Sequence, residues 1–427
     1  MRSKILTVSA AVLALGMTAA CGGGSGSSDA ATATGPIKVW LSNNPEEIAW
    51  GKAMVQEWNS AHPKEKVTAQ EIPAGKTSEE VIGAAITAGN APCLVFNTSP
   101  AAVPQFQKQG GLVALDEFSG AKDYIEARSG ASADQYQSPD GKFYQIPWKQ
   151  NPVMIFYNKD LFKKAGLNPD SPQLSTYADF LAASKKIVDS GAAPSAIAPA
   201  PTSEFFQSWF DFYPLYAAES GGKQTVENGK ATFNDQAGKD VWNFWAQMYK
   251  NGYAPREAYS GDAFADKKAA MAVVGPWAIS VYKDKVNWGV VPVPTKDGMD
   301  ASKVNTFTDA KNIGLYSACT NQKTAWDLLK FATSKDQDGK LLEKTGQMPI
   351  RTDLPTTYAD YFAKNPDYKQ FADQASRTVE VPNIPNSVEI WQAIRDNYSK
   401  SVIFGKSSVD DGLAAAASKA DELAGQS

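Results

Sequence analysis

Histidine is almost missing from this chain of 427 residues, since His62 is the only one. A single histidine excludes a Ser-His-Asp or Cys-His catalytic pair elsewhere in the sequence, and it excludes the two-histidine HExxH zinc site. His62 stands where the first helix is expected to end, so a solvent-facing position is favoured over catalysis. Gly75, Lys76 and Thr77 resemble the end of a phosphate-binding loop, but Gln70 occupies a position where that motif requires glycine.

Cysteine and clustered basic residues are also scarce. The three cysteines include no CxxC pair, which argues against a structural zinc site. The formal net charge is −4 and no group of lysines and arginines stands out, so nucleic acid is not expected as a partner. Carboxylates are plentiful, however, and a glycosidase needs only two of them, so a surface glycosidase stays open as an alternative.

The N-terminus has the pattern of an export signal. Arg2 and Lys4 precede an apolar run at 5–17, small residues follow, and Cys21 stands where a signal peptidase would cut. The run is too short to span a membrane, and no later apolar run reaches that length. A buried first strand or helix is the alternative, but the Gly, Ser, Ala and Thr residues after Cys21 are typical of a flexible tether.

We therefore predict a signal peptide at 1–20 and a tether at 21–35. Cys21 in this position is similar to the acylated cysteine of bacterial lipoproteins, although Thr18 stands where such proteins usually have leucine. The resemblance implies an exported protein on the extracellular face of the cell membrane, held there by the lipid on Cys21 and not by a spanning helix.

The mature part of the chain predicts an α/β fold. It is too long for one ordinary core, so two lobes are expected. Apolar runs at 37–41, 67–72 and 94–96 predict strands, and apolar residues at helical spacing within 48–61 and 81–86 predict helices between them. This alternation indicates a largely parallel sheet.

The middle and the end of the chain are richer in helical patterns, with a few strands among them. No internal repeat of 20 to 50 residues is visible. The expected helices lie at 180–188, 205–216, 241–248, 264–274, 325–331 and the C-terminus, and the expected strands at 153–157, 288–291 and 313–317.

The 11 tryptophans divide by context. Those in helical patterns or apolar strands are expected in the core: Trp40, Trp50, Trp58, Trp242, Trp245, Trp288 and Trp326. Those without such a context are candidates for ligand contact, three of them beside proline or in polar surroundings: Trp148, Trp209, Trp277 and Trp391. Exposed aromatic rings suit the apolar faces of sugars, whose hydroxyls pair with amides and carboxylates.

Four groups of motifs together resemble the extracellular carbohydrate-binding proteins of ABC importers. Their order and spacing match over nearly the whole mature chain. The motifs are DGKFYQIP at 140–147 with IFYNKDLFKKAGL at 155–167, AAMAVVGPW at 269–277, GVVPVP at 289–294, and TGQMP at 345–349 with VPNIP at 381–385 and Trp391.

The resemblance implies a two-lobed α/β receptor in which each lobe is a mostly parallel sheet flanked by helices. One lobe would comprise 36–149 plus 309–357, and the other 150–308 plus 358–427. A mono- or oligosaccharide would lie in the cleft between them, and the lobes would close over it by hinge bending. The implied partners are that carbohydrate and the permease subunits with their ATPase. A monomer without cofactor or catalytic activity is expected.

The resemblance also implies ligand-binding positions. Trp277 and Trp391 match aromatic platforms, and Phe210 or its neighbour Trp209 matches a third. Polar positions at strand ends and at the crossings between lobes complete the set. Glu47 is equally explained as a helix-start acid. The full predicted set is Asn43, Asn44, Glu47, Asn97, Trp148, Asn151, Trp209, Phe210, Trp277, Phe307, Asp309 and Trp391.

In the fold that the resemblance implies, Cys93 at the start of one strand lies near Cys319 at the end of an antiparallel neighbour, which favours a disulfide in an oxidising compartment. Two buried free thiols are the alternative. A receptor for another solute, such as a polyol, and a structural or adhesive lipoprotein also remain open functions. The asparagines at positions 97 and 151, where related receptors carry an aromatic ring and a carboxylate, argue against maltodextrin as the specific ligand.

Overall fold

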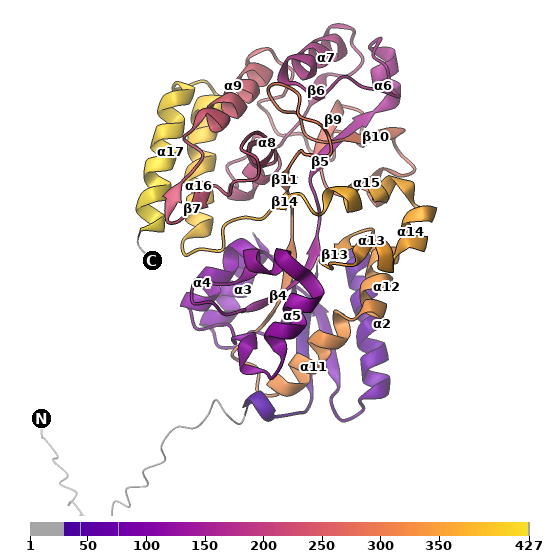
Figure 1. The fold of residues 1–427 in the computed structure, drawn as a ribbon, viewed down its shortest axis with the longest axis vertical. Coiled ribbons are helices and arrows are strands. Elements are labelled where there is room, and N and C mark those ends of the chain that lie inside the picture. Colours follow the sequence, from indigo (N-terminus) through magenta and orange to yellow (C-terminus); the bar gives the residue numbers. More distant parts are fainter. Residues whose placement is uncertain (1–29, 43, 76, 426–427) are drawn as a thin grey trace, which may run out of the picture.

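The computed structural model describes residues 30–42, 44–75 and 77–425. Two lobes stand one above the other, with the early part of the chain in the lower lobe and the middle in the upper (Figure 1). The predicted signal peptide, Cys21 and Asn43 lie outside the described residues. Within the described residues, no helix is both long enough and apolar enough to cross a membrane.

The first lobe is built around a six-stranded sheet in the order β13-β4-β12-β3-β1-β2. Its apolar side chains form two core clusters with the helices that cover the sheet. The elements are β1 (Ile37–Leu41), α2 (Pro45–Ala61), β2 (Val67–Glu71), α3 (Ser78–Thr87), β3 (Leu94–Thr98), η1 (Pro100–Ala102), α4 (Val103–Lys108), η2 (Leu115–Glu117), α5 (Ala121–Ser129), η3 (Gly130–Tyr136), β4 (Gln145–Gln150), β12 (Lys311–Leu315), α11 (Gln322–Ala332), α12 (Lys335–Thr345) and β13 (Met348–Pro349).

The second lobe has a four-stranded sheet in the order β10-β5-β9-β6, with its own larger core. The elements between the first and second crossings are β5 (Met154–Asn158), α6 (Lys159–Lys164), α7 (Tyr177–Asp189), β6 (Ser195–Ile197), η4 (Phe205–Trp209), α8 (Phe212–Glu219), β7 (Val226–Glu227), β8 (Lys230–Ala231), α9 (Gln236–Lys250), β9 (Ala269–Val274), α10 (Ala278–Tyr282), β10 (Trp288–Val291) and β11 (Thr306–Phe307).

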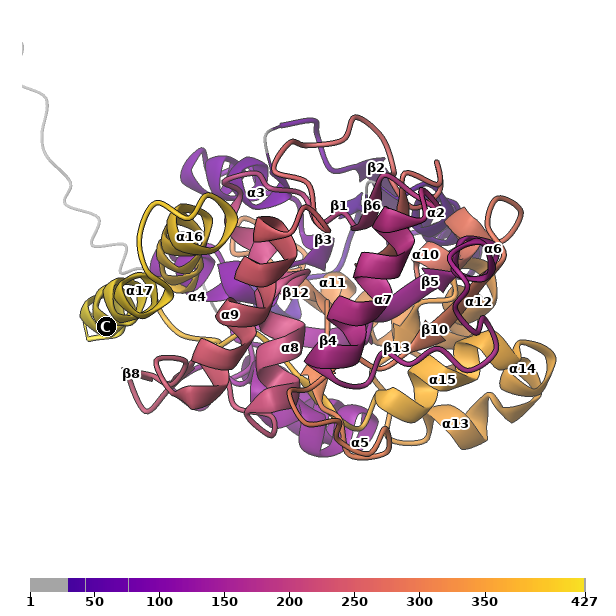
Figure 2. The same cartoon turned by 90° about the horizontal axis from the view of Figure 1, so that it is seen from above.

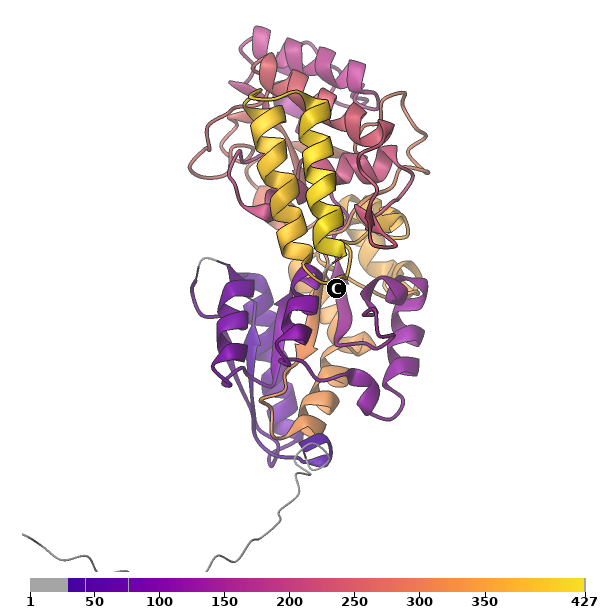
Figure 3. The ribbon, with the colours of Figure 1, turned by 90° about the vertical axis from the view of Figure 1, so that its left-hand side faces the viewer.

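The end of the chain returns to the second lobe. Helices α16 and α17 lie side by side on its flank (Figure 3). The elements after β13 are α13 (Leu354–Thr357), α14 (Ala359–Lys364), α15 (Pro366–Gln374), β14 (Thr378–Val379), α16 (Ser387–Tyr398), the π-helix η5 (Ser399–Ile403) and α17 (Val409–Ala424).

The chain therefore passes between the lobes after β4, after β11 and after β13, so the expected multiple crossings are confirmed. The first two crossings touch each other through an antiparallel bridge between Pro152 and Thr308. Seen from above, α7, α8 and α9 of the upper lobe lie across the middle of the view, and β1, β2 and α3 of the lower lobe come into view toward its upper edge (Figure 2).

The two-lobed α/β architecture agrees with the prediction, but the expectation of mostly parallel sheets is wrong. In the first sheet β1 pairs parallel with β2 and β3, whereas β12 and β13 pair antiparallel with their neighbours. In the second sheet only the described pairing of β6 with β9 is parallel. Strands β12 and β13 come after the chain has left for the other lobe, and they run against the strands they join.

A second correction concerns 264–274, which was expected to be a helix. The apolar residues Ala269–Val274 form strand β9 between β5 and β6. A short apolar run fits a buried strand as well as a helix, and here pairing on both sides decides for the strand.

The disulfide between Cys93 and Cys319 is present, with Cα atoms 4.5 Å apart. Strand β12 runs antiparallel to β3, and Leu315 is paired with Leu94, the residue after Cys93. This confirms both the bridge and the strand arrangement from which it was expected.

Candidate ligand-binding site

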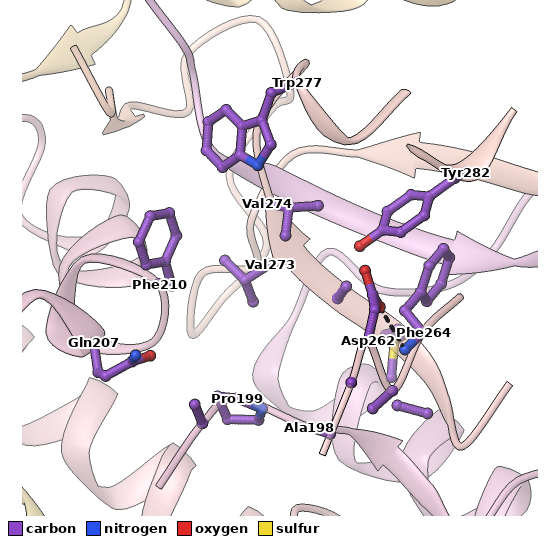
Figure 4. Close-up of a pocket in the computed structure, with 16 residues that line it drawn as sticks. Ala198, Pro199, Gln207, Phe210, Asp262, Phe264, Val273, Val274, Trp277 and Tyr282 are labelled. Atoms are coloured by element: carbon purple, nitrogen blue, oxygen red, sulfur yellow. Dashed lines mark hydrogen bonds between the residues drawn. The ribbon is translucent and has the colours of Figure 1, made fainter. Parts of the chain in front are cut away.

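A hollow of about 360 Å³ opens in the second lobe, which is within the usual size of small-ligand pockets. We call it the first hollow (Figure 4). Its wall is mostly apolar and includes four aromatic rings, one of them the phenol of Tyr282, together with the polar side chains of Gln207 and Asp262. The residues used below are Pro199, Gln207, Phe210, Asp262, Trp277 and Tyr282.

Trp277 is placed by the turn that ends strand β9. A β-carbon at Gly275 would come within 2.0 Å of the Trp277 ring, so only glycine allows the indole to fold back over the chain. Pro276 follows, and α10 begins at Ala278. The ring remains half-buried and faces the hollow in Figure 4, as the GPW motif predicted.

Phe210 supplies the second ring. Its centroid lies 6.0 Å from that of Trp277, and the two planes meet at 83°. Two rings at a right angle can cover two sides of a compact ligand. The sequence left either Phe210 or Trp209 at this position, and the structure places Phe210 in the hollow. Trp209 is 4% exposed and packs against Phe205 and Phe307 instead.

The polar groups of the hollow were not predicted. Asp262 accepts backbone hydrogen bonds from Phe264 and Ala265 at 3.0 Å, which fixes its carboxylate at the rim. Burial raises the pKa of Tyr282, and the nearby Asp262 raises it further, so this phenol stays neutral and can donate a hydrogen bond. Gln207 projects from η4. The sequence offers a weak signal for Tyr282 alone, which follows Trp277 by little more than one helical turn.

Two predicted ring contacts are corrected. Trp148 is 1% exposed in strand β4, where its ring packs against Trp50 at 5.4 Å and Phe96 at 5.5 Å. Trp391 is fully buried on the inner face of α16, with the Tyr213 ring centroid at 4.9 Å. Neither ring offers a face to a ligand, because each lies in a lobe core rather than in a loop.

Phe307 is a further correction, since it is 1% exposed and supports the site from beneath. Its ring lies 6.4 Å from Phe210 and 5.8 Å from Trp209, at the second crossing. Asp309, two residues on, forms an ion pair with Lys311 at 2.5 Å and remains partly exposed. The second crossing therefore carries a buried ring that packs against Phe210 and Trp209, followed by a charged pair.

Asn151 fastens the first two crossings together. Its backbone N–H donates to the Thr308 hydroxyl at 3.0 Å, and its side-chain amide donates to the Asp309 carbonyl at 3.0 Å and to Gln347 at 3.3 Å. It is 1% exposed. The structure thus places Asn151 between the crossings, where its amide is occupied by protein groups.

Asn44 and Glu47 are occupied at the start of α2. Asn44 caps the helix by accepting from the N–H groups of Glu46 and Glu47 at 3.1 and 3.0 Å. Glu47 is buried, paired with Lys149 and hydrogen-bonded by Gln347. Burial raises the pKa of Glu47, but Lys149, with help from Gln347, outweighs this and holds the pKa below its ordinary value.

Of the three predicted asparagines that the structure describes, Asn97 is the one whose side chain makes no described hydrogen bond. Its φ of 66° places it in the left-handed region, which asparagine tolerates better than most residues. It is half-buried near the end of β3. No group of three or more His, Cys, Asp or Glu side chains within the described residues is arranged to hold a metal ion.

The comparisons with known proteins agree with this architecture. The chain is 25% identical over 298 residues to a maltooligosaccharide ABC transporter solute-binding lipoprotein of Streptococcus pneumoniae, covering 65% of this chain and 66% of that protein, just under two thirds. It is 26% identical over 245 residues to the sn-glycerol-3-phosphate-binding periplasmic protein UgpB of Brucella melitensis, covering 54% and 55%.

Among solved structures, the cyclic alpha-maltosyl-1,6-maltose binding protein from Arthrobacter globiformis superimposes with a TM-score of 0.77 at 21% identity, over 92% of this chain and 100% of that one. That likeness establishes the shared fold. The family described as bacterial extracellular solute-binding protein matches residues 53–397. This chain belongs to that family.

Proposed function

We propose that this protein is the carbohydrate receptor of an ABC importer, which captures a mono- or oligosaccharide in the cleft between its lobes and delivers it to permease subunits driven by an ATPase. The observation that carries the proposal is the first hollow, where Phe210 and Trp277 meet at 83° beside Gln207, Asp262 and Tyr282. The rings suit the C–H faces of a pyranose, and the amide, carboxylate and phenol suit its hydroxyls.

The predicted lobe boundaries, the lipid on Cys21 and the monomeric state belong to the same proposal. The pneumococcal relative is a lipoprotein by name, which supports a lipid anchor here. The protein would act at the extracellular face of the membrane and catalyse nothing. Among the described residues that line the first hollow, Asp262 is the one carboxylate, whereas a glycosidase needs a pair that flanks the bond it cleaves.

Replacing Trp277 tests the site. Trp277→Ala should weaken binding by about 2 kcal/mol, or roughly thirtyfold in Kd, because the ring is a central anchor of the hollow. The ligand is first found by thermal shift with a panel of neutral mono- and oligosaccharides, glycerol and glycerol 3-phosphate, and its affinity is then measured by calorimetry.

Phe404→Ala is the matched control for that measurement, since Phe404 is 44% exposed and lies outside the hollow. It should leave affinity unchanged. Unaltered affinity of Trp277→Ala would show that the first hollow is not the sugar-binding site. Hydrolysis of the bound sugar would show that the protein is a glycosidase and not a receptor.

Ligand binding should also close the lobes. Three crossings connect the lobes, and the Pro152–Thr308 bridge holds the first two side by side, so that they can bend together as one hinge. Small-angle scattering at saturating sugar should give a smaller radius of gyration than without sugar. Superimposable curves would mean a receptor that is already closed.

A further inference from the structure

A second hollow, of about 430 Å³, lies between the lobes. One wall comes from α3 and α4 of the first lobe and the other from η4 and α16 of the second. Three glutamine side chains and the Phe205 ring line it together with carboxylates from both lobes. The residues that matter are Glu79, Gln105, Gln109, Glu204, Phe205 and Gln392.

The two hollows share the helix η4. Phe205 lines the second hollow and Gln207 lines the first. These two positions are about 4 Å apart along the axis of a 3-10 helix, so a ligand held between Phe210 and Trp277 would enter the second hollow by extending past η4.

The second hollow carries negative charge from both sides. Glu79 lies in the first turn of α3, and Glu204 precedes η4 in the opposite lobe. No lysine, arginine or histidine is found among the described residues that line either hollow. Burial lowers the pKa of the nearby Lys311, but the carboxylates of Asp309 and Glu79 outweigh this effect and raise the pKa above its ordinary value. The ammonium group of Lys311 forms its ion pair with Asp309, at 2.5 Å.

We infer that the ligand is an oligosaccharide spanning both hollows, and that Glu79 and Glu204 restrict its end in the second hollow to neutral or cationic sugars. Sugar hydroxyls and ammonium groups can donate hydrogen bonds to these carboxylates. A uronate or a phosphate ester would place a third negative charge near the carboxylates of Glu79 and Glu204, which closure of the lobes would bring closer together. This inference rests on the proposed carbohydrate function and distinguishes this chain from a receptor for a phosphorylated solute.

The test compares sugars that share a scaffold and differ only in the charge of one substituent. Maltotriose and cellotriose are each compared with derivatives in which a terminal ring carries a carboxylate or an amino group at C6, using calorimetry on the mature protein. For a scaffold that binds, the carboxylate derivative should bind at least about tenfold more weakly than the neutral sugar, since like-charge contact at an interface costs 1.4 kcal/mol or more. The amino derivative should bind at least as tightly as the neutral sugar.

Glu79→Gln combined with Glu204→Gln should abolish this ranking, strengthening the carboxylate derivative and weakening the amino derivative. Each replacement keeps the side-chain shape, and unchanged thermal stability confirms the fold. Glu343→Gln is the matched control, because Glu343 is exposed on α12 and lines neither hollow. It should keep the wild-type ranking.

The outcomes separate the inference from the proposed function. Equal binding of neutral and carboxylate sugars by the wild type, or an unchanged ranking in the double variant, overturns the charge selection while leaving a sugar receptor. Binding of glycerol 3-phosphate with no binding of any neutral sugar in the panel would overturn both.

Discussion

Removing the disulfide should lower the free energy of unfolding by about 5 kcal/mol, the largest stability change expected from any small alteration of this chain. Cys93 and Cys319 are 226 residues apart, and the closed loop contains most of the second lobe. A cross-link over such a loop restricts the unfolded chain strongly and the folded chain hardly at all. Urea unfolding of the oxidised protein and of Cys93→Ala/Cys319→Ala measures the difference.

Two further features of the measurement identify the mechanism. The slope of unfolding free energy against urea should be larger without the bridge, because the unfolded chain becomes more extended and exposes more surface. Sugar affinity should stay the same, since the bridge is at the start of β3 and Asn97 is near its other end. Cys21→Ala is present in every protein compared, so that only this pair varies. Equal midpoints for the bridged and unbridged proteins would contradict the entropic account.

Local patterns predicted the strands and helices of the first lobe well. Strand β1 covers the expected 37–41, with Ile37, Val39 and Leu41 facing the core. Helix α2 extends the expected 48–61 at its N-terminal end, where Asn44 supplies the cap. These elements depend on alternation, helical spacing and capping, which are properties of neighbouring residues.

The direction of strand pairing could not be read from local patterns. Strand β12 lies beside β3 and β4 because the chain leaves the lobe and comes back, and nothing in the sequence of Lys311–Leu315 records that path. The resemblance supplied it for the Cys93–Cys319 pair alone. The first three strands are parallel, and the prediction assumed the same direction for the later strands. Those strands enter from the other lobe, and their direction differs.

The tryptophans show how far a candidate site can be predicted. The five assigned to the core from helical spacing are all buried: Trp50, Trp58, Trp242, Trp245 and Trp326. Among the ligand candidates, Trp277 reaches the hollow because Gly275 and Pro276 fix its turn locally. Trp391 does not, because its burial depends on Tyr213 and Trp209, which are far away in sequence. Contacts of that kind are decided by tertiary packing.

Arg395→Met should lower the free energy of unfolding by about 3–5 kcal/mol, because it leaves the Asp211 carboxylate buried without its countercharge. Both side chains are fully buried, and the Nη1 of Arg395 donates to Asp211 at 2.7 Å. The same guanidinium donates to the carbonyls of Thr202 and Ala200 at 2.7 and 2.8 Å. Ala200 and its neighbour Pro199 line the first hollow, so the variant should also bind sugar more weakly.

The stability deficit of Arg395→Met should depend on pH in one direction. Burial raises the pKa of Asp211, and Arg395 opposes this without cancelling it, so the pKa is above its ordinary value. Without Arg395 the pKa rises further. The folded variant then keeps a proton that the unfolded chain releases above about pH 4, which makes folding less favourable as pH increases from there. Urea unfolding across the pH range from acid to neutral should show the largest deficit near neutrality and a small one near the ordinary pKa of aspartate.

Removing both charges tests whether the pair itself carries the effect. Asp211→Asn/Arg395→Met should recover a large part of the loss, because asparagine keeps an oxygen for the Phe212 N–H while the unpaired charge is gone. Arg256→Met is the matched control, since Arg256 makes one described hydrogen bond, to the Ile403 carbonyl, and should cost only about 1 kcal/mol. A deficit that is the same at every pH and persists in the double variant would show that Arg395 stabilises the lobe through its two carbonyl hydrogen bonds and its packing contacts alone. Recovery in the double variant together with the pH dependence would show instead that Arg395 stabilises the wall of the first hollow mainly by neutralising the charge of Asp211.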